Sequence, residues 1–504
     1  MSHPNRAIRH GRTKRFLVGA IALATVAALA PTASATPFVA SVSVTSETYV
    51  LLYRSGAKTS GAAAAVEAAG GTLVANYEAI GVVIARSENA GFEAAIEQAH
   101  GVEASATSGL GVYGGVDLNA ADANADVPAA GSDSEPLAGL QWDMEQINAF
   151  AAHEISGGDP DVVVGDLDTG LDFTHPDLAS NYSAALSADC SSGAPTPLLP
   201  GNDQNGHGTH TAGTIAAAVN GIGITGVAPN VTIAGIKSSN DDGFFFPEMV
   251  ICSYMWVADH DIDVTNNSYF ADPWLFNCVN DSEQRAIWEA ERRAIRHAQS
   301  QGTVVVASEG NFSDDLSHPT QDVTSPDNTT PVTREITNAC RVVPVEVPGV
   351  IGVTATGDLS LKAYYSNYGI STADVAAPGG DRRFQVTPAA ANGRVLSTWP
   401  AAVACPLSVV DQGAIYCYLQ GTSMAGPHVA GVAALIISHT GKSGGAAAAA
   451  VQQATNPLPC PDTSAPIYAD FPSVSNGAPQ ECTGGLGHNS FYGSGEIDAL
   501  KAVS

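Results

Sequence analysis

The hydrophobic pattern of the chain contains a buried strand and two apolar helices. Three consecutive valines at 162–164 indicate a strand that is buried on both faces, as in a parallel sheet. Two runs of small apolar residues, 212–218 and 429–437, follow glycine-rich turns and predict closely packed central helices. An Ala-rich stretch at 444–450 predicts the start of a surface helix. Buried strands and helices in one region favour an α/β core.

A region nearer the N-terminus has a separate pattern. It predicts one strand at 49–53 and two more within 72–85, with helices at 61–69 and 90–100. This order indicates a small α+β unit in which helices cover an antiparallel sheet. We assign it to residues 47–115.

The first 35 residues have the features of an export signal. Five Lys or Arg residues and no acidic residue precede an apolar stretch at 16–30, and Ala33-Ser34-Ala35 follows. We expect cleavage after Ala35 and secretion to the extracellular space, because the apolar stretch is short for a membrane span. An uncleaved anchor is the alternative. Residues 116–136, rich in Ala, Asp and Gly, predict an exposed linker that contains a maturation site.

The composition is strongly acidic. The formal net charge is −29 at pH 7, and loss of the basic leader would leave about −34. Such a surface repels nucleic acid and anionic membranes, so we expect neither as a partner once the leader has been removed. A monomer is expected.

Eight cysteines all lie between residues 190 and 482. An even number in an exported chain indicates disulfides. The spacing does not fix their connectivity, although Cys405 with Cys417 and Cys460 with Cys482 are plausible local pairs. The chain has no C-x-x-C motif, which argues against a zinc ribbon or a redox dithiol.

Three glycine-containing motifs supply an acid, a base and a hydroxyl: D-T-G at Asp168, H-G-T-H at His207 and G-T-S-M-A at Ser423. A Ser hydroxyl is a poor nucleophile unless an imidazole accepts its proton, and a buried carboxylate must orient that imidazole. Asp168 lies at the end of the valine strand. Ser423 precedes a predicted helix, whose N-terminal N–H groups favour an oxyanion. Together the motifs predict a serine hydrolase.

In these motifs and their order, the chain from about residue 141 to residue 504 resembles the subtilisin-like serine proteases. The resemblance implies that Asp168, His207 and Ser423 are catalytic. It implies that Asn311, after the run V-V-V-A-S-E-G, joins the Ser423 N–H in an oxyanion hole. It also implies a three-layer αβα sandwich with a mostly parallel sheet over 137–504, preceded by a ferredoxin-like propeptide that inhibits the enzyme within the same chain.

The chain departs from the family pattern near the primary specificity pocket. Where the family commonly has S-L-G, this chain has Ser268-Tyr269-Phe270, and with Gly310 these residues are expected to bind substrate. A Phe in place of Gly predicts a preference for small residues before the scissile bond. The alternative is that Tyr269 and Phe270 pack outward against neighbouring loops. The Phe run at 244–246 either lines the substrate cleft or anchors a loop.

A second departure is Glu309, which stands where a small residue is usual. It is expected to raise the pKa of His207 if it is buried nearby, and to have little effect if it points to solvent. His210 forms an H-x-x-H pair with His207, and we interpret it as a packed residue rather than a metal ligand.

Structural calcium is common in this family, although the chemistry needs no cofactor. Acidic loops at 240–243 and 313–315 offer oxygen ligands. The loop 219–226 resembles one family calcium loop but offers mainly Asn220. Metal ligands therefore stay unassigned.

The sequence predicts a secreted serine endopeptidase, made as a self-inhibited proenzyme, that cleaves proteins or peptides through an acyl-enzyme. Two alternatives stay open. One is a protease-derived binding or adhesion protein in which the altered pocket blocks turnover, and the other is an esterase or peptide ligase that uses the same acyl-enzyme.

Overall fold

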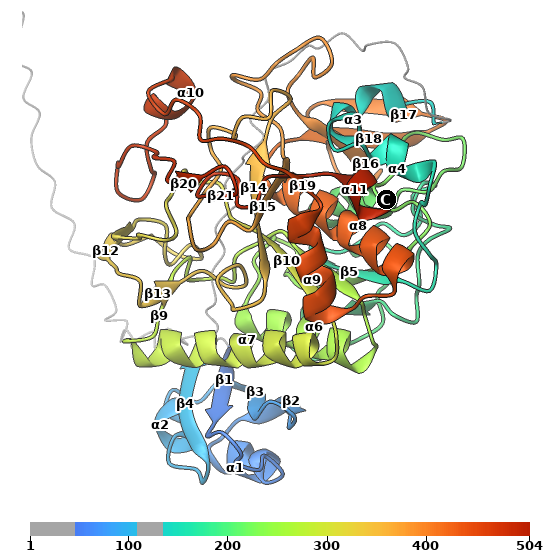
Figure 1. The fold of residues 1–504 in the computed structure, drawn as a ribbon. Coiled ribbons are helices and arrows are strands. Elements are labelled where there is room, and N and C mark those ends of the chain that lie inside the picture. The colour runs from blue at the N-terminus through green and yellow to red at the C-terminus, as the bar shows by residue number, and fades with distance from the viewer. Residues whose placement is uncertain (1–45, 108–134) are drawn as a thin grey trace, which may run out of the picture. The chain divides into compact units, whose positions relative to one another are not determined.

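The computed structural model describes residues 46–107 and 135–504 (Figure 1). The predicted signal peptide and nearly all of the predicted linker lie outside these residues. A sheet of nine strands, in the order β19-β22-β15-β14-β10-β8-β5-β7-β6, forms the centre of the larger region. Neighbouring strands are parallel except at the β19–β22 edge. The strands are β5 (Val163–Asp168), β6 (Ala188–Asp189), β7 (Thr232–Lys237), β8 (Val264–Asn267), β10 (Val304–Ser308), β14 (Ile351–Thr356), β15 (Val375–Pro378), β19 (Thr455–Asn456) and β22 (Glu496–Ile497).

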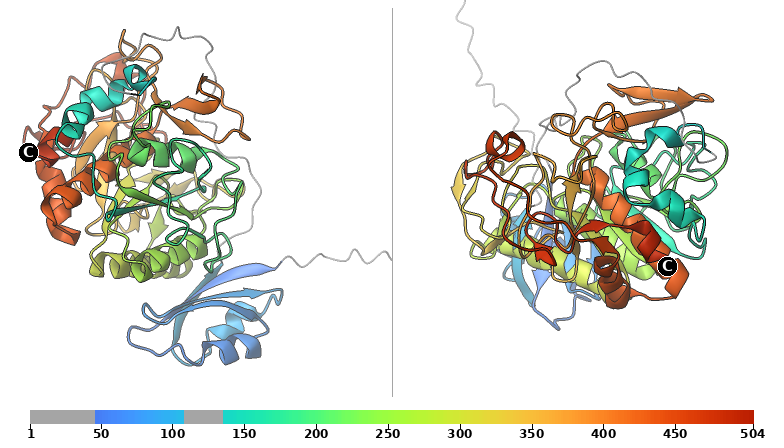
Figure 2. Two further views of the ribbon diagram at one scale, coloured as in Figure 1. Left: turned by 90° about the vertical axis from the view of Figure 1, so that its right-hand side faces the viewer. Right: turned by 45° about the horizontal axis from the view of Figure 1, so that its top comes forward.

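Helices cover both faces of this sheet, each around its own hydrophobic cluster. One face carries α4 (Ala149–His153), α5 (His207–Ala216), α8 (Thr422–Thr440), α9 (Gly444–Gln453) and α11 (Ala499–Ala502). The other carries α6 (Pro247–Asp259) and α7 (Ser282–Ser300), which lie side by side (Figures 1 and 2). The three-layer α/β architecture expected from the sequence is therefore confirmed, as are the strand at 162–164 and the helices at 212–218, 429–437 and 444–450.

The composition of each helix fits its surroundings. The middle of α8 is buried on all sides because its residues are small or aliphatic. A Cβ on Gly431 would lie 2.6 Å from the Val227 side chain, so the packing of α8 on Val227 leaves no room for a larger residue there. By contrast, α7 is amphipathic, and the Asp281 carboxylate caps it by accepting from the N–H groups of Glu283 and Gln284.

The N-terminal region folds as a four-stranded antiparallel sheet in the order β2-β3-β1-β4. Its elements are β1 (Glu47–Tyr53), α1 (Ala62–Ala68), β2 (Thr72–Tyr77), β3 (Val82–Ser87), α2 (Phe92–Ile96) and β4 (Val102–Thr107). The predicted α+β unit is present with its three expected strands and two helices. The fourth strand, β4, follows the last predicted helix; the hydrophobic pattern did not indicate it, although the ferredoxin-like order implied by the resemblance includes it.

Smaller elements are added around the central sheet. They are η1 (Ala138–Leu140), α3 (Trp142–Gln146), α10 (Pro466–Ala469), the pairs β9–β13 (Asn277–Cys278, Cys340–Arg341), β11–β12 (Gln321–Asp322, Arg334–Glu335) and β20–β21 (Gly484–Gly485, His488–Asn489), and a sheet of β16 (Val395–Trp399), β18 (Ala414–Leu419) and β17 (Ser408–Asp411). No helix among the described residues is long and apolar enough to cross a membrane.

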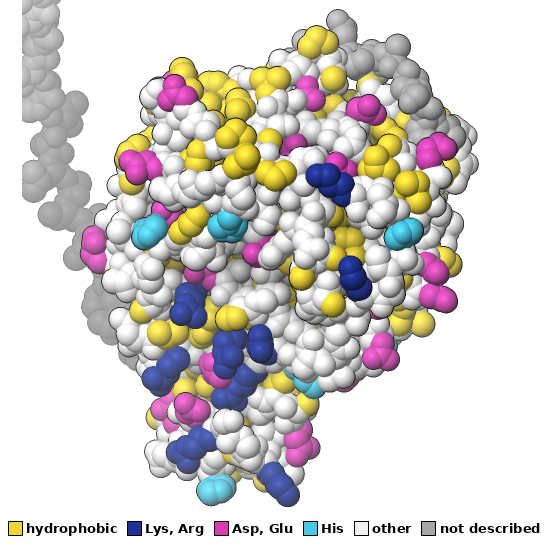
Figure 3. All heavy atoms as spheres, viewed as in Figure 1, with side chains coloured by type: hydrophobic (Ala, Val, Ile, Leu, Met, Phe, Trp, Pro, Cys, Tyr) yellow, Lys and Arg dark blue, Asp and Glu magenta, His cyan; other side chains and the backbone are white. Residues whose placement is uncertain are grey.

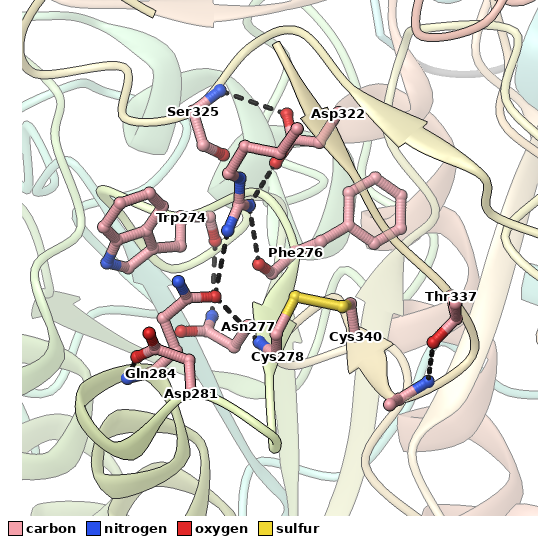
Figure 4. The surroundings of a disulfide bond; sticks show 12 residues. Trp274, Phe276, Asn277, Cys278, Asp281, Gln284, Asp322, Ser325, Thr337 and Cys340 are labelled. Carbon is pink, nitrogen blue, oxygen red and sulfur yellow. Dashed lines mark hydrogen bonds and ion pairs between the residues drawn. A yellow bond between two sulfur atoms is a disulfide. The ribbon is translucent and has the colours of Figure 1, made fainter. Parts of the chain in front are cut away.

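All eight cysteines form disulfides. The local pairs Cys405–Cys417 and Cys460–Cys482 are confirmed, and Cys190–Cys252 and Cys278–Cys340 complete the set. Figure 4 shows Cys278–Cys340 joining β9 to β13.

Beside this disulfide, the Arg334 guanidinium lies 4.6 Å from the ring centroid of Trp274 and donates to the Phe276 carbonyl at 2.9 Å (Figure 4). It also forms an ion pair with the buried Asp322. These contacts and the disulfide hold the long segment between β10 and β14 against the segment that follows β8.

Candidate active site

The carboxyl end of β5 brings an acid to the first residue of α5. Asp168 is fully buried, and its Oδ1 lies 2.7 Å from Nδ1 of His207. The same oxygen accepts from the Thr169 N–H at 2.7 Å. Gly206 turns the chain into α5 with φ of 95°, and a Cβ there would lie 2.5 Å from the Trp399 ring. Gly206, directly before the H-G-T-H motif, is therefore needed to bring the His207 imidazole against the Asp168 carboxylate.

Opposing influences act on the imidazole. Burial lowers the pKa of His207, but the neighbouring acids, above all Asp168, raise it, and the net shift is upward. Because Asp168 bonds to Nδ1, Nε2 is left to face a reacting group. The pair has the arrangement required of a general base and its orienting acid.

Ser423 is the second residue of α8, and α8 packs against α5. Among the described residues, its hydroxyl donates to the Ser268 carbonyl at 3.3 Å and not to His207. Catalytic hydrogen bonds are often long or absent in substrate-free structures. The hydroxyl must therefore leave the Ser268 carbonyl before His207 can accept its proton.

Asn311 lies beside the start of α8. Its Oδ1 accepts from the Thr422 N–H at 2.9 Å and from the Thr422 hydroxyl at 3.1 Å. Because Oδ1 faces Thr422, the Nδ2 donor is directed away from Thr422. The neighbouring Gly310 has φ of 102°, and a Cβ there would lie 2.7 Å from Asn367. The Gly310 N–H donates to the Thr422 hydroxyl at 3.1 Å, so it does not face the substrate.

The other three residues expected to bind substrate, Ser268, Tyr269 and Phe270, lie in different surroundings. The Ser268 carbonyl accepts from the Ser423 hydroxyl. The buried Ser268 hydroxyl in turn donates to the Ser423 carbonyl at 3.0 Å. The ring of Tyr269 is turned into the core, where it stacks on Phe245 at a centroid distance of 4.2 Å. Phe270 stays half-buried and meets Phe312 edge to face at 6.4 Å.

The Phe run at 244–246 is buried. Its central ring belongs to the Tyr269 stack, whereas Phe244 and Phe246 stack on each other at 5.9 Å and pack with Met249. This part of the chain anchors its loop, as the second of the two sequence interpretations proposed.

Glu309 fits neither of the two expectations for it. The side chain is 1% exposed, so it does not point to solvent, yet it is not among the groups that shift the pKa of His207. Burial raises its own pKa well above the ordinary value, and the groups around it are Thr372, Glu346, Asp374 and Asp315. The Glu309 carboxyl group is therefore enclosed in the interior next to β10 and is not part of the active site. His210 is buried as expected, with Nε2 2.9 Å from the Cys417 carbonyl, and burial lowers its pKa to about 3.

The loops that offered calcium ligands are occupied by hydrogen bonds within the protein. The Asp177 carboxylate lies beside the loop 219–226 and faces donors: the Tyr416 hydroxyl at 2.8 Å, the Ile224 N–H at 3.2 Å and the Asn220 Nδ2 at 3.2 Å. Calcium requires oxygen lone pairs, so this donor set does not fit it.

The other two candidate loops are similar. Asp241 pairs with Lys237, Asp314 accepts from Ser473 and Ser475, and Asp315 pairs with His318. No group of three or more His, Cys, Asp or Glu side chains within 46–107 and 135–504 is placed to hold a metal ion.

Two carboxylates near the site were missed by sequence reasoning. Asp203 is buried and accepts from the Thr169 hydroxyl at 2.9 Å, the Gly206 N–H at 2.7 Å and the Thr209 hydroxyl at 2.6 Å, which holds the turn before His207. Asp166 precedes Asp168 by two residues in β5. An acidic residue inside a strand that otherwise reads as buried was the available signal for Asp166.

Comparisons with known proteins agree with this geometry. Residues 159–467 match the model of the subtilase family. Subtilisin BL of Lederbergia lenta is 31% identical over 299 residues, which are 59% of this chain and 84% of that protein. Subtilisin E of Bacillus subtilis is 30% identical over 299 residues, and the match spans 59% of this chain and 61% of the relative.

Solved structures show the same fold. The epidermin leader peptide processing serine protease of Staphylococcus aureus superposes with a TM-score of 0.66 at 22% identity, over 91% of this chain and 98% of that one. Together with the family match and the Asp168–His207 geometry, these similarities show that the chain belongs to the subtilase family of serine endopeptidases.

Proposed function

We propose that the protein is a secreted subtilase, made as a self-inhibited proenzyme, that hydrolyses proteins or peptides through an acyl-enzyme on Ser423. The observation that carries the proposal is the 2.7 Å contact between Asp168 and His207 at the N-terminus of α5, which packs against the helix of Ser423. Subtilases need no cofactor for catalysis.

The proposed reaction uses four groups. The Ser423 hydroxyl turns from the Ser268 carbonyl and gives its proton to Nε2 of His207 as Oγ bonds to the substrate carbonyl carbon. Asn311 Nδ2 and the Ser423 N–H stabilise the oxyanion. His207 then gives the proton to the leaving amine as the peptide bond breaks. Water, activated by the same imidazole, releases the acyl group and returns the proton to Ser423.

We also propose a preference for small residues before the scissile bond. Phe270 follows Ser268 by two residues and Phe312 follows Asn311, so their rings come from the two segments that flank the nucleophile. An edge-to-face pair of rings in this position leaves little space for a large substrate side chain. The Phe312 N–H donates to Asn367 Oδ1 at 2.8 Å and its carbonyl accepts from the Val474 N–H at 2.9 Å, which supports a fixed wall.

The N-terminal sheet is proposed to be the inhibitory propeptide. Leu52, Val82 and Ile84 belong to the same hydrophobic cluster as residues of α6. Arg293 of α7 donates to the Tyr53 carbonyl at 2.8 Å, and Tyr77 donates to the Gly193 carbonyl at 2.8 Å. A domain that belongs to the same chain and is held by these contacts is present at a high effective concentration relative to the catalytic region that it inhibits. Self-cleavage between about residues 105 and 135 would separate the two parts.

Labelling with a fluorophosphonate tests the catalytic proposal. Wild type should be labelled at Ser423, whereas Ser423→Ala should not be labelled and His207→Ala should react far more slowly. A wild type that stays unlabelled after removal of its N-terminal region would favour the binding-protein alternative. Cleavage of a peptide library then tests specificity: turnover after Ala or Ser should exceed turnover after Phe or Leu, and a Phe270→Gly variant should reduce that difference.

A further inference from the structure

A second carboxyl group, Asp166, lies next to the proposed triad without a role in acyl transfer. Residues two apart in a strand project from the same face, so Asp166 and Asp168 both face α5. Asp166 is 2% exposed. Burial of a carboxyl group is costly unless hydrogen bonds compensate for lost hydration, so its partners indicate what it does.

Two partners connect Asp166 to a helix and to the next strand. Its Oδ2 lies 2.7 Å from the hydroxyl of Thr211, one turn after His207 in α5. Its Oδ1 accepts from Nδ2 of Asn266 at 2.9 Å, and these two residues are paired in the parallel register of β5 and β8.

The contacts continue to the nucleophile. Asn266 Nδ2 also donates to the Ser268 hydroxyl at 3.2 Å, and that hydroxyl donates to the Ser423 carbonyl at 3.0 Å. A Cβ on Gly426 would lie 3.0 Å from Asn266 Oδ1, so α8 packs directly on this row of polar groups. An unbroken set of buried hydrogen bonds thus leads from α5 to the first turn of α8.

We propose that Asp166 is a positioning residue that fixes the helix of His207 relative to the helix of Ser423 through Thr211, Asn266 and Ser268. The inference rests on the proposed function of His207 and Ser423. Displacement of a reacting group by about 1 Å can cost about 10²-fold in rate, so a rigid link between the two helices has a catalytic consequence.

The geometry accommodates a protonated Asp166. With the proton on Oδ2, Asp166 donates to the Thr211 hydroxyl, whose own hydrogen goes to the Gly208 carbonyl at 3.0 Å. The charged or titratable groups that face it are Asp168 of the same strand and His207 of α5. Burial and the charge of Asp168 raise the pKa of Asp166 well above its ordinary value. A neutral carboxylic acid supplies the link without a second negative charge beside Asp168.

The test compares kcat, KM and pH profiles of the full chain after maturation, with active sites counted by burst titration. Asp166→Ala and Thr211→Val remove the link, and each should lower kcat by at least about 10-fold while KM changes by less than about 3-fold. Asp166→Asn can donate to Thr211 and accept from Asn266, so its kcat should stay within about 3-fold of wild type with an unchanged acid limb. Thr214→Val is the matched control, because within the described part of the chain the hydroxyl of this buried residue of α5 makes one hydrogen bond, to the His210 carbonyl at 3.4 Å.

Three results would overturn the inference: wild-type kcat in Asp166→Ala or Thr211→Val, an Asp166→Asn variant as slow as Asp166→Ala, or an acid limb that moves in Asp166→Asn. A wild type without activity would instead contradict the proposed function. In that case thermal unfolding of Asp166→Ala, Thr211→Val and the double variant still tests the link. If the two residues share one hydrogen bond, the double variant must lose less unfolding free energy than the sum of the two single losses.

Discussion

His207 is the residue whose state controls the proposed chemistry. Burial disfavours its charged form, whereas the neighbouring acids, above all Asp168, favour it, and the net shift of its pKa is upward. A general base must be neutral to accept a proton. The same acids that orient the imidazole therefore also restrict the pH range in which it works.

The pH profile of kcat/KM should show this shift. Since the pKa of His207 is raised, the neutral form is depleted as pH falls, and activity should decline on an acid limb whose midpoint lies above pH 6.5, the ordinary value for His. Steady-state rates on a small chromogenic peptide, normalised to titrated active sites, measure it. A midpoint below about pH 6 would contradict the assignment of these carboxylates.

Asn311 can be tested with two substitutions that separate its two functions. Asn311→Ala removes both the proposed oxyanion donor and the acceptor for Thr422, whereas Asn311→Asp keeps the acceptor and removes the donor. Both should lower kcat by about 10²–10³-fold, the loss that removal of one oxyanion donor causes in a subtilisin, with little change in KM. Near wild-type kcat in Asn311→Asp would rule out an oxyanion role.

The motifs were sufficient to propose the acid, base and nucleophile, because the glycine turns and small residues around them are local features. The surroundings of Asp166 and Glu309 could not be predicted in the same way. Asp166 finds its partner Asn266 in the next strand of the sheet, and Glu309 is enclosed by Thr372 and Glu346. Contacts between residues so far apart in sequence appear only once strand order is known.

At the scale of elements, the sheet of β16, β17 and β18 supports the loop that follows the helix of His207. Tyr416 of β18 donates to Asp177, and Asp411 of β17 accepts from the Gly223 N–H at 3.0 Å. The Cys417 carbonyl meets His210 of α5. The Tyr416 hydroxyl thus binds Asp177, the carboxylate that contacts the loop 219–226, which resembles a calcium loop.

Stability should therefore depend on Tyr416 and not on calcium. Tyr416→Phe removes one hydrogen bond to a carboxylate and should cost about 1–3 kcal/mol of unfolding free energy. Thermal unfolding at pH 7.5, in a Ser423→Ala background that prevents self-digestion, measures the loss. A chelator should leave the melting temperature of the same background unchanged. A fall of several degrees with chelator, reversed by calcium, would contradict this interpretation of the loop.

Among the elements, periodicity predicted those with strong apolar runs and missed β4. Its residues, Val102–Thr107, alternate weakly and are mostly small, and the strand is defined by antiparallel pairing with β1. The small sheets of β9–β13, of β11–β12 and of β16, β17 and β18 were also not predicted from the sequence. Two of the three depend on disulfide pairing or on side-chain contacts across long loops.

At the scale of the whole molecule, the net negative charge and the buried carboxyl groups both make the folded state less stable as pH rises. The chain carries a formal charge of −29, and many of the basic side chains visible in Figure 3 lie over α7, which carries Arg285, Arg292, Arg293 and Arg296. Burial raises the pKa of Asp177 to about 6, of Asp374 to about 6 and of Glu346 to about 7. Each of these groups holds a proton in the folded state over a pH range where the unfolded chain has released it.

Stability should therefore fall as pH rises. The contribution of these three groups is fully present below their unfolded pKa values near 4 and is lost as pH passes 6 to 7, while repulsion among the other carboxylates grows. In the Ser423→Ala chain, the melting temperature should be higher at pH 5 than at pH 8. Glu346→Gln should reduce the difference. An equal or higher melting temperature at pH 8 would show that other groups dominate.

The most direct test of the central claim is the intact mass of the secreted product from wild type and from Ser423→Ala, compared side by side. We predict that only wild type loses its N-terminal region, that its mass places the cut between about residues 105 and 135, and that Ser423→Ala keeps residues 46–107 attached. Identical processing of both would show that Ser423 does not perform the cleavage. An unprocessed wild type would contradict the self-inhibited proenzyme altogether.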